Sequence, residues 1–280
     1  MNKDLVNILT KLKQLRGIDF LNYQPRMLDR RVTARLAQLG MDDYALYLQR
    51  LENEPTECDQ LIDVIAINVS SFFRDPIVYE IIAQKVLPEL IEQKNHPGLR
   101  ELRVWSAGCA AGEEPYSLAI LFHEELKEPA KNWKTYLFGT DIDNNALQRA
   151  AKAIYPRESL VDTKFGILDK YFEQVEDQFK LNTAICDNVR FSQDDLTSKK
   201  TDSPTESVFG GFDLIFCRNV LIYFNRDLQK QVMSKFLRSL TPGGYLVLGS
   251  SETLAAEIAP WFKTVDFRNK IYQKLPGKLA

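Results

Sequence analysis

Residues 104–121 read V-W-S-A-G-C-A-A-G-E-E-P-Y-S-L-A-I-L, and this stretch decides the fold. It starts within an apolar strand, 102–105, and continues as a loop of small residues, 106–112. The next residues, Glu-Glu-Pro at 113–115, suit the first turn of a helix, where carboxylates match the helix dipole and proline lacks only an N–H that would be unpaired. A strand, a small-residue loop and a helix in this order predict a ligand pocket at the carboxyl end of a strand in an open α/β sheet.

The charges around this loop narrow the class of ligand. Gly108 and Gly112 allow the backbone to approach a ligand closely, but the loop runs into Glu113 and Glu114 and contains no Lys or Arg. These two carboxylates would repel a pyrophosphate, and the sequence has neither G-x-G-x-x-G nor G-K-[ST] here. A cationic nucleoside without phosphates, S-adenosylmethionine, fits better. The alternative is a tight strand-to-helix turn with no ligand.

Composition places the chain among soluble globular proteins. It has 280 residues, of which 45% are hydrophobic and 26% charged, with a net charge of −2. This length accommodates one large domain and a small one. No apolar run of about 18 residues occurs, which argues against a membrane span, and charges interrupt the N-terminal apolar pattern, which argues against a secretory signal.

Cysteine and histidine usage argues against a metal site and against histidine-based hydrolysis. The residues concerned are Cys58, Cys109, Cys186, Cys217, His96 and His123. They form no C-x-x-C and no zinc-ligand spacing, so we expect no metal and reduced thiols, as in the cytoplasm.

Residues 1–66 read as a series of short helices with a basic face. Residues 1–40 carry eight Lys or Arg against three Asp, a net charge of +5. Four arginines lie away from the apolar arc of the helix expected from Pro25 to Leu39: Arg26, Arg30, Arg31 and Arg35. We interpret them as docking an acidic partner; the alternative is a solvated face. No aromatic residues interleave with them, so nucleic acid is not favoured.

From residue 102 the pattern alternates between strands and helices, which predicts a parallel sheet covered by helices. Parallel strands are expected at 102–105, 135–139, 189–192, 212–217 and 245–249, with an antiparallel pair at 264–267 and 270–274. Residues 155–188 break the rhythm and predict an inserted antiparallel β subdomain. The predicted fold class is α/β, a doubly wound, mostly parallel sheet with a small all-helical N-terminal domain. The predicted domains are 1–75, helices and linker, and 76–280, which holds the insertion.

An acidic residue follows the second strand, in T-D-I-D at 140–143. Asp141 at this point can accept hydrogen bonds from both ribose hydroxyls of a nucleoside. We expect Asp143 to cap the helix that follows, and Asp227 to cap the helix that precedes the last parallel strand.

Five motifs, taken in this order, resemble those of the CheR-type chemotaxis receptor methyltransferases. They are N-V-S-S-F-F-R-D, V-W-S-A-G-C-A-A-G-E-E-P-Y-S, T-D-I-D, F-D-L-I-F-C-R-N-V-L-I-Y-F and P-G-G-Y-L-V-L-G-S-S-E. The resemblance covers nearly the whole chain. It implies transfer of a methyl group from S-adenosylmethionine to glutamate side chains of membrane chemoreceptors, which gives glutamyl methyl esters.

The resemblance also implies roles for residues at matching positions. The implied cofactor contacts are Asn68, Ser70, Arg74, Glu114, Asp141, Asp195, Leu196, Arg218 and Asn219. Arg74 is also expected to clamp the substrate carboxylate, and Tyr223 to lie near the reacting methyl group. Asp195 stands where relatives often have Asn, and its oxygen can still accept from the adenine amino group.

The implied partner is the cytoplasmic helical bundle of a chemoreceptor, docked by the basic helix of the N-terminal domain. The inserted β subdomain is expected to bind a receptor C-terminal tail by strand addition in some members. The enzyme would then be cytoplasmic, recruited to membrane receptors without inserting into the bilayer. Two alternatives stay open: an S-adenosylmethionine-dependent methyltransferase of another substrate, and a non-catalytic S-adenosylmethionine-binding scaffold.

Overall fold

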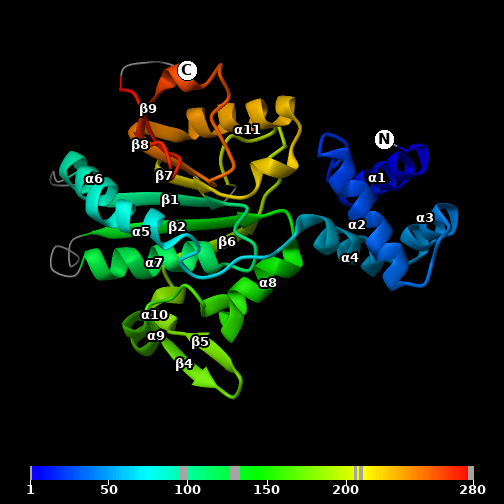
Figure 1. The fold of residues 1–280 in the computed structure, drawn as a ribbon, viewed down its shortest axis with the longest axis horizontal. Coiled ribbons are helices and arrows are strands. Elements are labelled where there is room, and N and C mark those ends of the chain that lie inside the picture. The colour runs from blue at the N-terminus through cyan, green and yellow to red at the C-terminus, as the bar shows by residue number, and fades with distance from the viewer. Residues whose placement is uncertain (1, 95–99, 127–132, 205–206, 208–210, 277–280) are drawn as a thin grey trace.

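The computed structural model describes residues 2–94, 100–126, 133–204, 207 and 211–276. A helical N-terminal domain lies to one side of a large mixed sheet, and a second, small sheet lies below it in Figure 1. This arrangement confirms the predicted fold class.

The N-terminal domain consists of four helices whose ends follow local signals. They are α1 (Lys3–Arg16), α2 (Pro25–Gln38), α3 (Tyr44–Asn53) and α4 (Pro55–Ala66). Helix α1 ends at Gly17, which adopts the left-handed conformation that glycine accepts without a Cβ penalty. Proline opens both α2 and α4, where its missing N–H costs nothing. The apolar faces of the four helices are buried against one another.

The chain leaves α4 through an extended segment, 67–75, whose backbone is strained. Ile67, Phe73 and Asp75 all have positive φ angles, of 54°, 55° and 60°. Such conformations cost about 1–3 kcal/mol each for residues other than glycine, and they persist only where the surrounding structure imposes them. Helix α5 (Pro76–Ile81), a π-helical turn (Ile82–Val86) and α6 (Leu87–Lys94) follow.

Seven strands form the large sheet in the order β6-β2-β1-β7-β8-β10-β9. The strands are β1 (Glu101–Ala107), β2 (Lys134–Asp141), β6 (Val189–Gln193), β7 (Phe212–Cys217), β8 (Leu240–Leu248), β9 (Phe262–Asp266) and β10 (Ile271–Lys274). The first five in the sheet order pair in parallel, and β10 pairs antiparallel with both β8 and β9. All six residues of β7 are buried, as expected for a central strand covered on both faces.

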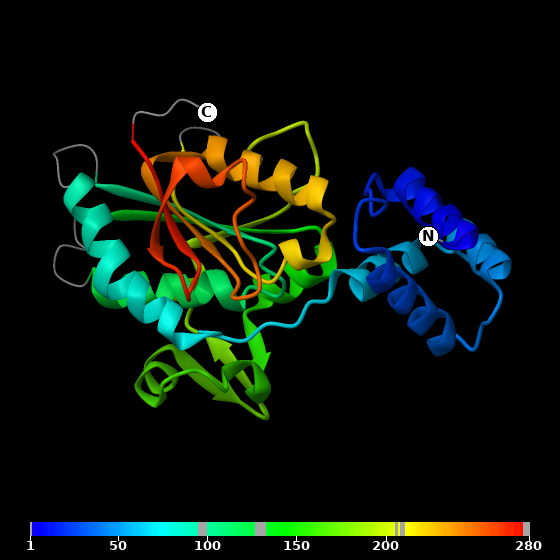
Figure 2. The same cartoon turned by 45° about the horizontal axis from the view of Figure 1, so that its top comes forward.

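Helices cover both faces of this sheet (Figures 1 and 2). Helix α11 (Arg226–Ser239) packs with Trp105 and Ile215 on one face, while α5, α6 and α7 (Glu113–Glu125) pack with Val104 and Leu214 on the other. The alternation of neighbouring residues between faces is the two-residue period of a strand. Helix α8 (Asn144–Lys152) packs against β2 and β6.

The small sheet is the predicted antiparallel insertion, with strand order β3-β5-β4. The inserted segment consists of β3 (Ile154–Pro156), a 3-10 turn (Arg157–Leu160), α9 (Phe165–Tyr171), β4 (Phe172–Val175), β5 (Gln178–Leu181) and α10 (Thr183–Cys186). Among the residues that the structure describes, two further 3-10 turns occur, η4 (Leu221–Tyr223) and η5 (Ala259–Trp261). Within the described residues, no helix is both long enough and apolar enough to span a membrane.

Candidate functional site

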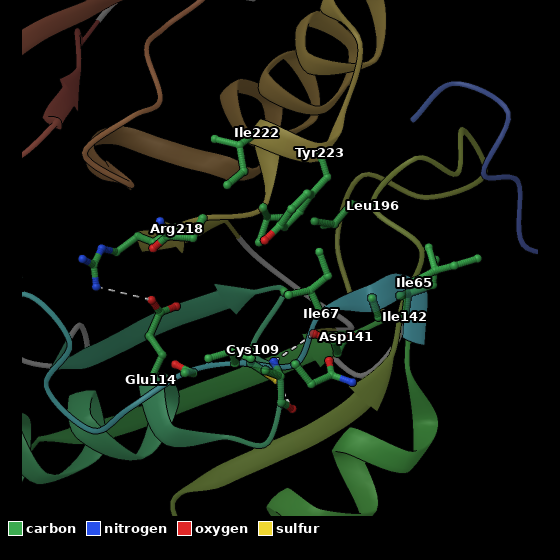
Figure 3. Close-up of a pocket in the computed structure, with 18 of the residues that line it drawn as sticks. Ile65, Ile67, Cys109, Glu114, Asp141, Ile142, Leu196, Arg218, Ile222 and Tyr223 are labelled. Atoms are coloured by element: carbon green, nitrogen blue, oxygen red, sulfur yellow. Dashed lines mark hydrogen bonds and ion pairs between the residues drawn. The ribbon is translucent and has the colours of Figure 1, made fainter. Parts of the chain in front are cut away.

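An open cavity of about 1190 Å³, including the solvent at its mouth, lies where the parallel strands end. Its walls come from three parts of the chain: the α1–α2 loop with the end of α4, the extended segment 67–75, and the loops that follow the sheet strands. In Figure 3, Ile222, Tyr223 and Leu196 lie on one side of the cavity, and Glu114, Cys109 and Asp141 on the other. The helical domain therefore contributes to the same cavity as the sheet.

The loop after β1 is shaped by two glycines. Gly108 has a φ of +78°, and a Cβ placed on it would lie 2.4 Å from Val220 Cγ2. Gly112 has a φ of +90°, and its Cβ would lie 2.8 Å from Ala150 Cβ. Glycine is therefore needed at both positions, for its backbone conformation and for the close approach of two neighbouring elements.

The Asp141 side chain, at the end of β2, is hydrogen-bonded to the loop that follows β1. One carboxylate oxygen accepts from the Ala110 N–H at 2.8 Å, and the other accepts from the Asp143 N–H at 3.0 Å. Burial raises the pKa of Asp141, and these two backbone N–H donors oppose that rise. Each oxygen keeps a second lone pair, so the carboxylate can still accept from a ligand hydroxyl.

Glu114 and Arg218 form a buried charge network at the other end of the cavity. Ser106 donates to Glu114 Oε1 at 2.7 Å, and Glu114 Oε2 lies 3.8 Å from Arg218 Nη1, as the dashed line in Figure 3 marks. Arg218 also forms an ion pair with Asp75 and donates to the Arg74 carbonyl at 3.0 Å. Burial raises the pKa of Glu114, and Arg218 opposes this rise. Arg218 Nε is buried and has no hydrogen-bond partner in the described part of the chain, which leaves a donor for a ligand.

Arg74 and Tyr223 both line the cavity, as expected. The Arg74 guanidinium donates to the Val69 carbonyl at 3.2 Å. Asp75 and Glu114 form their ion pairs with Arg218, and within the described residues Arg74 forms none, although its charge acts on Glu114. Arg74 can therefore receive an incoming carboxylate.

Glu252 organises the loop that carries Arg218 and Tyr223, and sequence reasoning did not assign it a role. Its carboxylate is 4% exposed and accepts five backbone N–H groups at 2.6 to 3.3 Å. Four come from residues 219–222 and the fifth from Gly249. A carboxylate in G-S-S-E directly after a parallel strand was the available signal, since this is where the other site residues lie.

Of the two residues expected around the base, Leu196 and Asp195, the cavity lining includes only Leu196. Leu196 lines the cavity, and so does Asp194, whose Oδ2 is buried without a partner. Asp195 is not among the lining residues: its Oδ1 accepts from the Thr197 N–H at 2.8 Å and from the Thr197 hydroxyl at 2.7 Å. Of this adjacent pair, Asp194 is the residue that lines the cavity, and Lys235 of α11 acts on its charge.

The remaining expected contacts also reach the cavity. Asn68, Ser70 and Asn219 line it. The Asn68 side-chain amide donates to Asp143 and, at 3.1 Å, to Asp63. Asp143 caps α8 as predicted, accepting from the Asn145 N–H at 2.8 Å. Burial raises the pKa of Asp143 to about 6, and the neighbouring Asp63 adds to this rise.

One docking assignment requires correction. Arg35 is not available to a partner, because its guanidinium donates to both carboxylate oxygens of Glu57, at 2.9 and 2.7 Å. Glu57 is 2% exposed and also accepts from the Tyr47 hydroxyl at 2.8 Å. Arg35 thus joins α2 to α4 within the helical domain. Arg26 and Arg30 are exposed, and Arg31 is partly exposed.

The residues of the cavity fit S-adenosylmethionine. The carboxylates of Glu114 and Asp141 suit a ligand that carries an ammonium group and ribose hydroxyls, and Leu196 and Ile142 offer apolar contact for a base. A parallel sheet with these side chains at its carboxyl edge fits the class of S-adenosylmethionine-dependent methyltransferases.

Comparison with known families places the chain within this class. Residues 68–271 match the model of the CheR methyltransferase S-adenosylmethionine-binding domain, and residues 3–66 match the CheR methyltransferase all-alpha domain. The chain therefore belongs to the CheR methyltransferase family, and most residues that line the cavity lie in its S-adenosylmethionine-binding domain.

Individual relatives agree with this assignment. The chemotaxis protein methyltransferase of Salmonella typhimurium is 33% identical over 248 residues, covering 86% of this chain and 81% of that protein. The corresponding protein of Borreliella burgdorferi is 31% identical over 241 residues, covering 85% and 83%. An uncharacterised 104.1 kDa protein of Rhodobacter capsulatus is 34% identical over 262 residues, but this chain spans only 26% of its length. The protein is accordingly similar to methyltransferases that act in chemotaxis.

Likeness to solved structures is weaker. The magnesium protoporphyrin IX methyltransferase of Synechocystis, solved with bound S-adenosylmethionine, matches with a TM-score of 0.36 and 16% identity over 72% of this chain and 81% of that one. The assignment therefore rests on the family models, the sheet order and the cavity.

Proposed function

We propose that the enzyme transfers the methyl group of S-adenosylmethionine to glutamate side chains of chemoreceptors and forms glutamyl methyl esters. One observation supports this substrate above all. The cavity contains a guanidinium, Arg74, while the two carboxylates beside it are paired with Arg218. A planar guanidinium matches the geometry of a carboxylate acceptor.

The same cavity offers a partner for each part of the cofactor. Asp141 would accept from the ribose hydroxyls, and Glu114 would face the ammonium group. The Nε donor of Arg218 would bind the cofactor's carboxylate, with Asn68, Ser70 and Asn219 completing the polar wall. Leu196 would cover one face of the adenine. We place Asp194 at the adenine amino group and give Asp195 the role of shaping this turn.

Methyl transfer to a carboxylate requires no proton transfer by the protein. Bound S-adenosylmethionine supplies an electrophilic methyl group, so that a carboxylate oxygen forms the new O–C bond as the C–S bond breaks. A glutamate side chain has a reference pKa of about 4.3 and is already ionised at neutral pH. No general base is therefore required. Arg74 orients the substrate carboxylate, Tyr223 borders the reacting groups, and the gain in rate comes from positioning.

Docking is assigned to the exposed basic face of α2. Arg26, Arg30 and Arg31 would contact the acidic surface of a receptor's cytoplasmic helical bundle. An edge of the small sheet could add a strand from a receptor tail. The enzyme would then act in the cytoplasm and reach the membrane only through its receptor.

The test is transfer of labelled methyl groups to receptor-containing membranes, followed by mild base, which releases methanol from esters only. We expect base-labile label with the wild-type protein. We expect Arg74→Ala to lose most of the transfer while its calorimetric affinity for S-adenosylhomocysteine stays close to that of the wild type. Arg226→Ala, an exposed change at the start of α11, serves as the control.

Other outcomes identify the alternatives. Base-stable label would indicate a different acceptor. Cofactor binding without any transfer would indicate a scaffold. Transfer at the wild-type rate by Arg74→Ala would remove Arg74 from its proposed role.

A further inference from the structure

The loop between α1 and α2 is hydrogen-bonded to the segment that carries Tyr223. The Gln24 N–H donates to the Tyr223 carbonyl at 2.8 Å, and the Gln24 side-chain amide donates to the Phe224 carbonyl at 2.9 Å. The Asn225 N–H donates to the Asn22 carbonyl at 3.0 Å. Together with the antiparallel bridge between Tyr23 and Phe224, these bonds make a short two-stranded contact between residues 200 positions apart.

Aromatic packing supports this contact. The Tyr23 ring meets the Phe224 ring edge-to-face at 4.8 Å and the Phe20 ring at 4.9 Å. Phe20 and Phe224 are buried, and both Phe20 and Tyr23 line the cavity. The loop is therefore a wall of the cavity as well as a support for η4.

The η4 segment is held from two sides by different parts of the protein. Glu252 accepts the N–H groups that precede Tyr223, and it belongs to the sheet domain. Gln24 donates to the carbonyls of Tyr223 and Phe224, and it belongs to the helical domain. Within the sheet domain, Gln229 also donates to the Phe224 carbonyl, at 3.2 Å.

Gln24 is also the residue before α2. Helix α2 begins at Pro25, whose ring fixes the backbone at the junction, and the exposed Arg26 follows directly. Little chain length separates the proposed docking face from the hydrogen bonds to Tyr223. A movement of α2 on docking would therefore reach the carbonyls of η4 through Gln24.

We propose that Gln24 is a positioning residue, which acts through Tyr223 and couples the docking of a substrate on α2 to methyl transfer. The inference rests on the proposed function, because it concerns Tyr223 during transfer to a docked carboxylate. It assigns the helical domain a part in the reaction itself, in addition to substrate binding.

The test compares Gln24→Ala, Gln24→Glu and Gln24→Lys in the full chain, with Gln38→Ala at the exposed end of α2 as the control. Alanine removes the side-chain donor, glutamate replaces it with an acceptor of the same length, and lysine restores a donor. Measured quantities are kcat and KM for receptor-containing membranes. The stoichiometry of S-adenosylhomocysteine binding gives the fraction of each variant that is folded and able to bind, and the Kd gives its affinity.

We expect kcat to fall by about two- to tenfold for Gln24→Ala and Gln24→Glu, the range for one lost hydrogen bond, because the Phe224 carbonyl keeps its bond from Gln229 and the backbone bond to Tyr223 remains. KM and Kd should be nearly unchanged. Gln24→Lys should recover most of kcat, and Gln38→Ala should match the wild type. Equal kcat values for the Glu and Lys variants would overturn the inference, and so would a wild-type kcat for Gln24→Ala. If Gln24→Ala does not fold, the comparison of kcat between Gln24→Glu and Gln24→Lys decides the test. Absence of ester formation by the wild type would instead refute the proposed function.

Discussion

Replacement of Glu252 by glutamine tests whether one buried carboxylate holds the loop at the cavity. The carboxylate accepts three N–H groups on Oε1 and two on Oε2. The glutamine amide keeps a single oxygen. If that oxygen takes the place of Oε1, its NH₂ group faces the N–H groups of Asn219 and Gly249, which then lose their acceptor.

The size of the effect follows from these two donors. A buried donor without a partner costs about 1–3 kcal/mol, so Glu252→Gln should lower the free energy of unfolding by about 2–6 kcal/mol. At about 2–4 °C per kcal/mol for a protein of comparable size, the Tm should fall by about 4–24 °C. Binding of S-adenosylhomocysteine should weaken as well, because Arg218 and Asn219 belong to the same loop.

The assay is thermal unfolding with and without S-adenosylhomocysteine, together with calorimetric binding. Glu257→Gln is the matched control, because Glu257 is exposed and its ion pair with Lys230 lies at the surface. The control should unfold at the wild-type temperature. An unchanged Tm and an unchanged affinity for Glu252→Gln would refute the argument that these hydrogen bonds hold the loop.

Three further changes have defined outcomes. Asp141→Asn should weaken S-adenosylhomocysteine binding by at least about tenfold, as expected for the loss of charge-assisted hydrogen bonds, and an unchanged calorimetric Kd would exclude the ribose assignment. Arg35→Ala should lower the free energy of unfolding by up to about 3 kcal/mol, because the buried Glu57 loses its bidentate partner and keeps only the Tyr47 hydroxyl and the more distant Arg50. Arg30→Ala should leave urea unfolding unchanged and raise KM for the receptor; equal stability of the two variants would contradict this division of roles. Burial raises the pKa of Glu113 to about 7. Between the ordinary pKa of a glutamate and about pH 7, the folded state therefore keeps a proton on Glu113 that the unfolded chain has released. The free energy of unfolding falls as the pH rises through this range. Above about pH 7, Glu113→Gln should therefore be more stable than the wild type by up to roughly 3 kcal/mol and should unfold at a higher temperature. This advantage should disappear toward about pH 5, and a stability difference independent of pH would contradict the assignment.

The sheet and the ligand loop could be predicted because local sequence determines them. A buried strand, glycines and a proline-containing helix start lie within one short stretch, 102–115. Asp143 was likewise predictable as a cap, because it directly precedes α8. Asp227 was predicted wrongly: Asn225 caps α11 by accepting from the Leu228 N–H, and Asp227 lies in the first turn, where its charge suits the helix dipole equally well.

Contacts between distant segments could not be predicted in this way. The helical period places Arg35 away from the apolar arc, but it does not reveal that the buried Glu57 of α4 lies opposite. The same holds for Gln24, whose partner is 200 residues away. These positions depend on how the helices pack, and one sequence gives no measure of that packing.

A ligand in a cavity built by both domains acts as a cross-link between them. Phe20 and Tyr23 from the helical domain face the same space as Asp141 and Leu196 from the sheet domain. A molecule that binds only the native state stabilises it in proportion to the logarithm of its concentration over Kd. Resistance to proteolysis along segment 67–75, which joins the two domains, should therefore rise with the concentration of the methyl donor.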